Sequence, residues 1–306
     1  MLGLTTSVAG ALLGAYALIT KQNRLLASVR QWSWFLPVAG LGAFVVMEVA
    51  LFQRDYSVSY VQTVGSAVTP PLYNFAALWS ALEGSIILWA MILTLYIGAV
   101  LYKFRARGND PLLGWAIVVL LGISAFFFAL MAGPANPFTP VDVPLGFQGP
   151  GPNPLLQNHL LVAFHPPMLY LGYVGFSVPF AFATAALITG RVGEGWLVET
   201  RRWTVAAWGF LTAGIILGAW WSYEVLGWGG YWAWDPVENA SLLPWLTGTA
   251  YLHSVMVQER RGMLRVWNLS LLCATFCLTI LGPFLTRSGV VESVHAFSDG
   301  ALGPGL

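Results

Sequence analysis

The chain has 306 residues, of which 57% are hydrophobic and only 9% are charged, whereas about a quarter of the residues of a soluble domain are charged. Its formal net charge of +1 provides neither a basic field for nucleic acid nor an acidic field for cations. The composition therefore predicts an integral membrane protein without a nucleic-acid partner, whose specificity lies in local sites.

Eight apolar runs in the sequence approach the roughly 20 residues that a membrane-spanning helix needs. They predict an all-α, polytopic bundle of about eight transmembrane helices that forms a single membrane domain over residues 1–306. The runs lie at residues 2–20, 33–53, 84–102, 112–132, 166–189, 203–222, 240–258 and 266–286.

Basic residues divide the connecting loops into two sets. Alternate loops hold twelve of the fourteen Lys and Arg residues, and only Arg54 and Arg287 fall in the other loops. The positive-inside rule places the basic loops in the cytoplasm. The N-terminus, the loop over residues 133–164, the tryptophan-rich segment over residues 222–239 and the tail over residues 287–306 are therefore predicted to be extracytoplasmic.

The long external loop over residues 133–164 is rich in proline and glycine. Its last part, residues 155–164, is too short to span a membrane, so we expect it to lie along the membrane surface. This places His159 near the lipid headgroups, as a hydrogen-bonded structural residue. Two acidic residues near the outer ends of predicted helices, Glu48 and Glu83, are expected to reach water and to have structural roles.

Two helix starts are marked by proline. Proline suits the first helical position because the N–H that it lacks would be unpaired there. We therefore expect a helix to start at Pro166 or Pro167, with His165 at its outer mouth and the imidazole facing outward. The same reasoning predicts that Asp235 caps the helix that begins at the following proline, and that Glu238 closes a capping box.

The glycine-rich run over residues 228–238 holds three tryptophans and a tyrosine between two predicted membrane spans. Its indoles predict a platform for a large, flat, apolar ligand, and glycines between them would let the backbone approach the edge of that ligand. The alternative is an aromatic belt at the membrane interface, which accounts better for isolated tryptophans than for a cluster. The platform residues are Trp228, Gly229, Gly230, Trp232 and Trp234.

Three of the four histidines are candidate iron ligands. His165 begins the fifth predicted helix and His295 follows the eighth, so the predicted topology places both on the side of the tryptophans. Two neutral imidazoles beside a flat aromatic platform fit axial ligation of a heme iron, whereas zinc would need three or four ligands. His253 lies inside the seventh helix, about 27 Å from the cap at Asp235 at about 1.5 Å per residue, where a polar group marks function unless it bonds a neighbouring helix.

The motifs together resemble a known family. The run over residues 228–241, Trp-Gly-Gly-Tyr-Trp-Ala-Trp-Asp-Pro-Val-Glu-Asn-Ala-Ser, resembles the WWD signature of heme-handling proteins in cytochrome c maturation. The fuller set is similar to the CcmF/NrfE family of cytochrome c heme lyase subunits, in a consistent order through almost the whole chain. The other motifs of this set begin at Trp79 (Trp-Ser-Ala-Leu-Glu-Gly-Ser), His165 (His-Pro-Pro-Met-Leu-Tyr-Leu-Gly-Tyr-Val-Gly), Pro244 (Pro-Trp-Leu-Thr-Gly-Thr-Ala-Tyr-Leu-His) and Arg287 (Arg-Ser-Gly-Val-Val-Glu-Ser-Val-His-Ala-Phe).

The resemblance implies two heme sites. His165 and His295 match the histidines that hold the iron of an incoming heme b beside the WWD segment, which includes Asp235. His253 matches one ligand of a second, stable b-type heme. Family members continue past the position of His295 and supply the second ligand of that heme, so here it would come from a missing segment or another chain. The sequence fits one piece of a split protein or a truncated form.

The resemblance also implies an activity and partners. The family receives heme from the chaperone CcmE, meets apocytochrome c through CcmH-type subunits, and forms thioether bonds to CxxCH cysteines in the bacterial or mitochondrial inner membrane. Because the substrate's own thiols attack, no side chain needs to act as an acid, a base or a nucleophile. The implied enzyme is a heme lyase within a multisubunit complex that includes the remaining C-terminal half. A CcmC-like heme exporter and a non-catalytic membrane scaffold are the alternatives.

Overall fold

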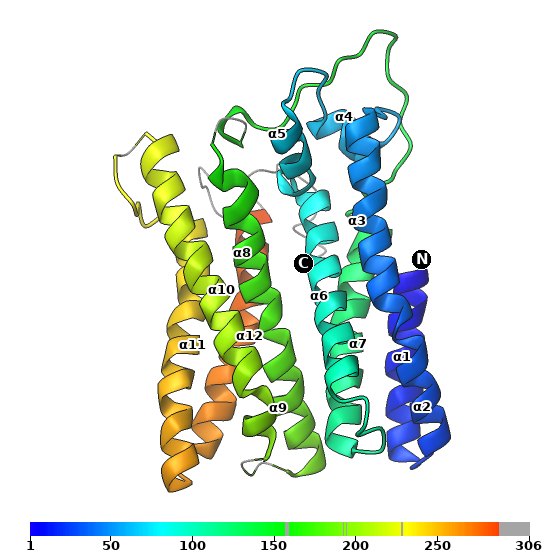
Figure 1. Cartoon of the computed structure of the whole chain (residues 1–306), viewed down its shortest axis with the longest axis vertical. Coiled ribbons are helices and arrows are strands. Elements are labelled where there is room, and N and C mark those ends of the chain that lie inside the picture. Colours follow the sequence, from blue (N-terminus) through cyan, green and yellow to red (C-terminus); the bar gives the residue numbers. More distant parts are fainter. Residues whose placement is uncertain (157–158, 192, 194, 228, 288–306) are drawn as a thin grey trace.

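The computed structural model describes residues 1–156, 159–191, 193, 195–227 and 229–287, and within them the chain is a bundle of long helices without a β-strand (Figure 1). Short 3-10 turns, η1 (Ala77–Trp79) and η2 (Pro154–Leu156), interrupt the connections. The α-helices are α1 (Leu2–Ile19), α2 (Asn23–Trp32), α3 (Phe35–Gln53), α4 (Ser59–Val64), α5 (Pro71–Ala76), α6 (Leu82–Lys103), α7 (Pro111–Ala132), α8 (Leu161–Gly175), α9 (Ser177–Thr189), α10 (Gly195–Val225), α11 (Pro236–Arg261) and α12 (Arg265–Arg287).

Seven helical segments of the described residues are long and apolar enough to cross a membrane, which confirms the polytopic, all-α prediction. The seventh predicted span, residues 240–258, corresponds to α11, which has 26 residues but is not among the seven found, because polar residues such as Asn239, Thr249 and His253 interrupt its sequence. It packs against α10 and α12 in the bundle. The seven are Leu2–Ile19, Asn23–Gln53, Leu82–Lys103, Pro111–Ala132, Leu161–Thr189, Gly195–Val225 and Arg265–Leu285.

Two helices begin earlier than the apolar runs predict. The helix expected from residue 203 starts at Gly195, so Arg201 and Arg202 lie within α10 and not in a loop. The helix expected from Pro166 or Pro167 starts at Leu161, and residues 161–164 form its first turn rather than a segment along the membrane surface. In both cases the added residues bury large side chains in the core: Trp196 and Leu197 in α10, Leu161 and Val162 in α8.

Helices α8 and α10 lie side by side at close range (Figure 1). A Cβ at Gly172 of α8 would come within 2.6 Å of Leu211 of α10, and one at Gly214 of α10 would come within 2.7 Å of Leu169. Small residues at such positions let two membrane helices approach each other along their backbones. This contact brings the first turns of α8 against the last turns of α10.

Two reciprocal hydrogen bonds join α10 to α11. The Trp208 indole N–H donates to the Thr249 hydroxyl oxygen at 2.8 Å, and the Trp245 indole N–H donates to the Thr212 hydroxyl oxygen at 2.9 Å. The two indoles stack with centroids 6.2 Å apart and an interplanar angle of 22°. Each half-buried indole N–H thus has an acceptor on the facing helix, which fixes the register of α11 against α10.

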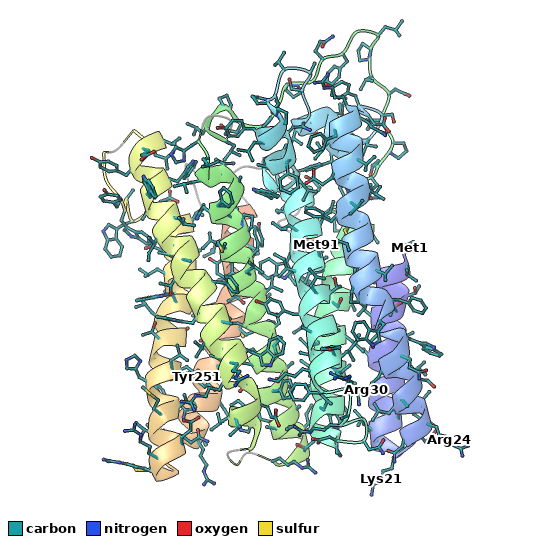
Figure 2. The ribbon with its side chains drawn as sticks, in the orientation of Figure 1. Met1, Lys21, Arg24, Arg30, Met91 and Tyr251 are labelled. Carbon is teal, nitrogen blue, oxygen red and sulfur yellow. The ribbon has the colours of Figure 1, made fainter. Side chains whose placement is uncertain are left out.

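Basic residues gather at one end of the bundle. Figure 2 labels Lys21, Arg24 and Arg30 there, and the connection from α11 to α12, with Arg260 and Arg261 beside it, lies at the same end (Figure 1). The residues that the sequence assigns to one side of the membrane therefore share one end of the fold. The assignment of that end to the cytoplasm stays a prediction.

An ion cluster closes this basic end between α7 and α10. Arg107 bridges the carboxylates of Asp110 and Glu199, and Arg191 lies 3.1 Å from Asp110. Asp110 also caps α7 by accepting from the Leu112 N–H. Burial acts to raise the pKa of Asp110, but the bonds from Arg107 and Leu112 outweigh it and hold the pKa below the usual 3.8.

We expect Asp110→Ala to destabilise the protein by about 1 kcal/mol, the usual cost of losing a helix N-cap. Because the folded-state pKa is depressed, the contribution of the carboxylate is present above pH 3.8 and fades as the pH falls through the folded value. Asp110→Asn is the control, since asparagine caps equally well. Thermal unfolding in detergent should rank Ala below Asn, and Asn slightly below the parent because it keeps the cap and loses the ion pairs. Equal stability of Ala and the parent would contradict the assignment.

The two acidic residues differ in environment. Glu83 lies half-buried in the first turn of α6, where a carboxylate is favoured by the helix dipole. Glu48 is only 9% exposed, and neither of its carboxylate oxygens has a hydrogen-bond partner among the described residues. The prediction that Glu48 reaches water is therefore wrong, because α3 turns it toward the core together with Met47 and Leu51.

Candidate functional site

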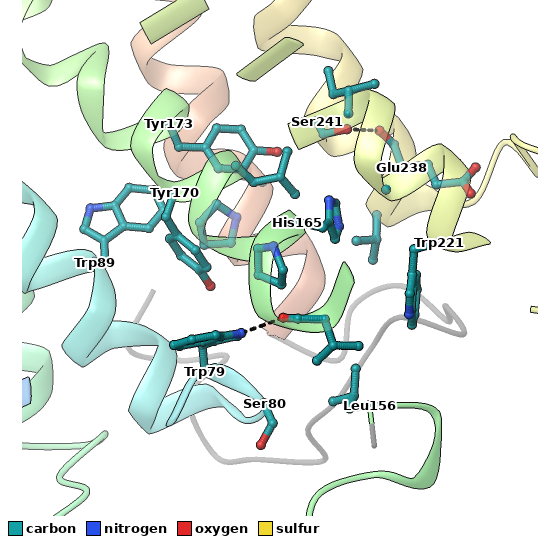
Figure 3. A pocket seen from close by; sticks show the side chains of 18 of the residues that line it. Trp79, Ser80, Trp89, Leu156, His165, Tyr170, Tyr173, Trp221, Glu238 and Ser241 are labelled. Atoms are coloured by element: carbon teal, nitrogen blue, oxygen red, sulfur yellow. Dashed lines mark hydrogen bonds between the residues drawn. The ribbon is translucent and has the colours of Figure 1, made fainter. Parts of the chain in front are cut away.

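The first turns of α8 carry two prolines inside the helix rather than before it. Pro166 has no N–H to donate to the carbonyl of Val162, one turn earlier. That carbonyl instead accepts the indole N–H of Trp79 at 3.0 Å (Figure 3). The predicted helix start at Pro166 or Pro167 is therefore wrong, since a donor from another element replaces the missing helical one. His165 lies within α8 and not at its mouth.

His165 points toward α10. Its Nδ1 lies 2.7 Å from the carbonyl oxygen of Gly214, and because a carbonyl only accepts, Nδ1 carries the proton. The neutral ring then holds its lone pair on Nε2, the nitrogen that would ligate a metal. The ring stacks near-parallel to Trp221, with centroids 6.4 Å apart and planes 14° apart. The outward orientation predicted for this imidazole is replaced by one between two helices.

A cavity of about 200 Å³ opens beside His165, between α8, α10, η1 and the starts of α6 and α11. Figure 3 shows the imidazole at its edge, with Trp221 on one side and the tyrosines of α8 on the other. Among the described lining residues, Glu238 is the only charged one. Apolar cavities with a few polar groups are the usual form of small-molecule sites. Its aromatic lining residues are Trp79, Trp89, Tyr170, Tyr173, Trp221 and Trp232.

The tryptophan-rich loop meets this cavity through one indole. Trp232 lines the cavity, whereas Trp234 is 71% exposed and adopts a positive φ of 60° directly before the cap. The two indoles stand edge to face, with planes 84° apart. They therefore do not form the one flat shelf that the sequence predicted. The aromatic surface beside the cavity instead includes helix residues such as Trp221.

The end of the loop is anchored as predicted. Asp235 accepts from the Val237 N–H and Glu238 accepts from the N–H groups of Ala233 and Asp235, which completes the capping box. Gly229 has a φ of 67°, a conformation that favours glycine. Gly230 follows it in a bend of the chain.

Of the described histidines, only His165 lines the cavity. Trp228 and His295 lie outside the described residues. His159 bonds the Glu224 carboxylate through Nε2 and accepts the Leu161 N–H on Nδ1, so it has the structural contacts expected of it. His253 is exposed on α11, with Nδ1 3.0 Å from the Thr249 carbonyl oxygen. Its neutral ring therefore also holds the lone pair on Nε2.

Three residues of α10 belong to the site although the sequence interpretation did not assign them. The Gly214 carbonyl oxygen accepts the hydrogen bond from His165 Nδ1, Trp221 stacks on the ring, and a Cβ at Gly218 would lie 2.4 Å from the His165 Cε1 atom. The sequence contains a pattern that could have indicated them: Gly214 and Gly218 form a Gly-x-x-x-Gly pair, the spacing typical of close membrane-helix contacts. Trp221 follows on the same helix face, three residues after Gly218.

Fold and cavity together define a polytopic helical membrane protein. It contains an aromatic cavity, and the imidazole of His165 lies at the edge of that cavity in a fixed tautomer. The family model described as Cytochrome C assembly protein matches residues 79–291. The chain belongs to this family, and the match begins at the tryptophan that contacts α8.

Individual relatives agree with the family. The chain is similar to the "Cytochrome c-type biogenesis protein CcmF" of Escherichia coli (strain K12), with 45% identity over 92% of this chain and 43% of the relative. The CcmF of Pseudomonas aeruginosa is 46% identical over 91% of this chain and 42% of the relative. A solved structure of "Cytochrome c Heme Lyase CcmF" aligns with a TM-score of 0.80 and 43% identity, over 94% of this chain and 46% of that one. The chain thus spans less than half the length of these relatives.

Proposed function

We propose that this chain holds heme at the cavity beside His165 and acts as part of a heme lyase in cytochrome c maturation. The observation that carries the proposal is the fixed imidazole: Nδ1 donates to the Gly214 carbonyl, Nε2 keeps the lone pair, and Trp221 lies parallel to the ring. The names of the relatives, cytochrome c-type biogenesis protein and cytochrome c heme lyase, support the same activity.

The residues of the site fit this role. An imidazole nitrogen is a heme ligand, and the apolar, aromatic lining suits a flat macrocycle. We assign His295 as a second ligand that would hold the iron, and Trp228, Trp232 and Trp234 with Gly229 and Gly230 as residues that would contact the macrocycle. In the reaction, each cysteine S–H of the substrate peptide adds across a heme vinyl group, with no leaving group. The chain therefore contributes orientation, an effect worth up to about 7 to 11 kcal/mol.

The partners follow from the proposed activity. A membrane-anchored chaperone of the CcmE type would supply heme b, a CcmH-type subunit would present the apocytochrome c, and a C-terminal portion, as in the longer relatives, would complete the lyase. The proposed active face is extracytoplasmic, in a bacterial or mitochondrial inner membrane, because the basic loops lie at the opposite end of the bundle.

The proposal is tested by titrating heme into the purified chain and recording absorption spectra. We expect a saturable, low-spin spectrum distinct from that of heme in protein-free detergent micelles, which is the control. Co-purification from native membranes followed by mass spectrometry should recover heme-delivery and apocytochrome-binding subunits. A heme spectrum identical to that of the micelles, with no such partners, would refute the proposal.

We assign His253 to a second, stable heme. Its exposed ring lies on a stripe of α11 that also exposes Leu243, Leu246, Ala250 and Val257. Because Nδ1 lies 3.0 Å from the Thr249 carbonyl oxygen, Nε2 is the nitrogen that would bind the iron. The second axial ligand would come from another segment or chain.

Protein purified with its native partners should show a b-type absorbance, and His253→Ala should lose it, because the iron would keep a single protein ligand. Heme content per protein and the reduced-minus-oxidised spectrum measure the change. His165→Ala, prepared in parallel, should retain this absorbance. Equal b-type absorbance in the parent and in His253→Ala would contradict the assignment.

A further inference from the structure

We propose that Trp79 is a positioning residue for the heme site: its indole N–H replaces the helical donor that Pro166 removes, and so fixes the turn of α8 that carries His165. The inference rests on the proposed function, because it concerns the orientation of the proposed ligand. The bond from Trp79 Nε1 to the Val162 carbonyl oxygen is 3.0 Å long and buried (Figure 3).

The first step is the local chemistry of α8. In a regular helix the carbonyl of Val162 would accept the N–H of residue 166, but proline has none. A buried carbonyl without a partner is costly, so a helix start with this sequence needs a donor from elsewhere. Trp79 provides it from η1, which is 83 residues away in the sequence.

The second step is that the donor itself is held firmly. The Tyr60 hydroxyl lies 2.8 Å from the carbonyl oxygens of Ala77 and Leu78 and accepts the N–H of Ala81, so it brackets the turn that carries Trp79. Burial raises the pKa of the Tyr60 hydroxyl, which keeps it protonated as a donor. Trp79 is 8% exposed, and its indole is therefore a fixed point of the fold.

The third step connects this point to the imidazole. His165 follows Val162 by three residues, almost one helical turn, so a rotation of that turn moves the ring against Gly214 and Trp221. A second bond fixes α8 farther along, where the Tyr96 hydroxyl donates to the Leu171 carbonyl at 3.0 Å. The two bonds hold α8 on both sides of His165, and Trp79 is the closer one.

The test compares Trp79→Phe, which keeps a ring and removes the N–H, with a matched control. Trp196→Phe makes the same change at a tryptophan that is 1% exposed and whose indole N–H has no hydrogen-bond partner among the described residues. In full-length protein with its native partners, we expect Trp79→Phe to weaken heme binding at the His165 site about tenfold and to convert part of the low-spin spectrum to high spin. Trp196→Phe should do neither.

A rescue distinguishes positioning from general packing. Pro166→Ala restores a backbone N–H opposite the Val162 carbonyl, so adding it to Trp79→Phe should recover the low-spin spectrum and most of the affinity. A purely space-filling role for Trp79 would give no rescue, and that result, or unchanged binding in Trp79→Phe, would overturn the inference. If Trp79→Phe alone does not accumulate, the double variant compared with the parent gives the same decision.

A heme-independent readout separates this inference from the proposed function. Amide hydrogen exchange at His165 and Met168 should speed up in Trp79→Phe, return in the double variant and stay unchanged in Trp196→Phe. If the parent binds no heme but the exchange follows this pattern, the positioning stands and the proposed function fails. If exchange is the same in all variants, the positioning role is refuted.

Discussion

Replacing His165 with alanine is expected to abolish heme ligation at the cavity and, with it, the maturation of a reporter cytochrome c. The substitution removes the Nε2 lone pair, the hydrogen bond to the Gly214 carbonyl and the face that stacks on Trp221. No other described histidine can replace it, because His159 is bonded to Glu224 and His253 lies on the exposed face of α11.

The measurement is heme-stained cytochrome c in membranes that carry equal amounts of each variant. His159→Gln is the matched control, because it removes a histidine from the segment just before α8 without touching the cavity lining. Exogenous imidazole should restore part of the low-spin spectrum of His165→Ala by occupying the space of the lost ring. Full maturation by His165→Ala would remove this residue from the mechanism.

The parts of the site that the sequence predicted correctly are those that local chemistry determines. Asp235 and Glu238 form their capping box through bonds within five residues, so the residue types and their spacing were sufficient. The membrane-spanning helices could also be predicted from the long apolar segments, because a membrane requires helices of that length and composition.

The start of α8 was mispredicted for a tertiary reason. The prolines after His165 favour a helix start, and they would have caused one if the Val162 carbonyl had lacked a donor. Trp79 provides that donor from a distant turn, so α8 extends one turn farther. The imidazole consequently faces α10 rather than the outside, which no local pattern around His165 could indicate.

The aromatic lining of the cavity shows the same limit. The sequence drew attention to the clustered tryptophans of the loop, yet within the described residues Trp232 alone among them lines the cavity. Trp221, Trp89 and Trp79 come from α10, α6 and η1, and they line one cavity only because these elements pack around α8. The sequence therefore indicated that the site is aromatic, but only the packing of the helices determines which aromatic residues line the cavity.

Gly218→Ala is expected to weaken heme binding and to slow the proposed heme attachment, the latter on the order of 100-fold, without removing any ligand. A Cβ at this position would lie 2.4 Å from the Cε1 atom of His165, and an ordinary contact begins near 3.4 Å, so the ring must move by about 1 Å. A misplacement of this size typically costs about two orders of magnitude in positioned chemistry. Because the Gly214 bond and the Trp221 stack both hold the ring in place, the shift must break one of them.

The control for this variant lies on the same helix. A Cβ at Gly209 would meet no atom within 4 Å, so Gly209→Ala adds the same methyl group to α10 and only improves its helix propensity, by about 1 kcal/mol. Heme titration and reporter maturation should therefore separate the two alanines sharply, with Gly209→Ala at the level of the parent. Equal heme affinity in both variants would mean that the ring can yield without cost, and that the close contact between α8 and α10 does not set the geometry of the proposed ligand.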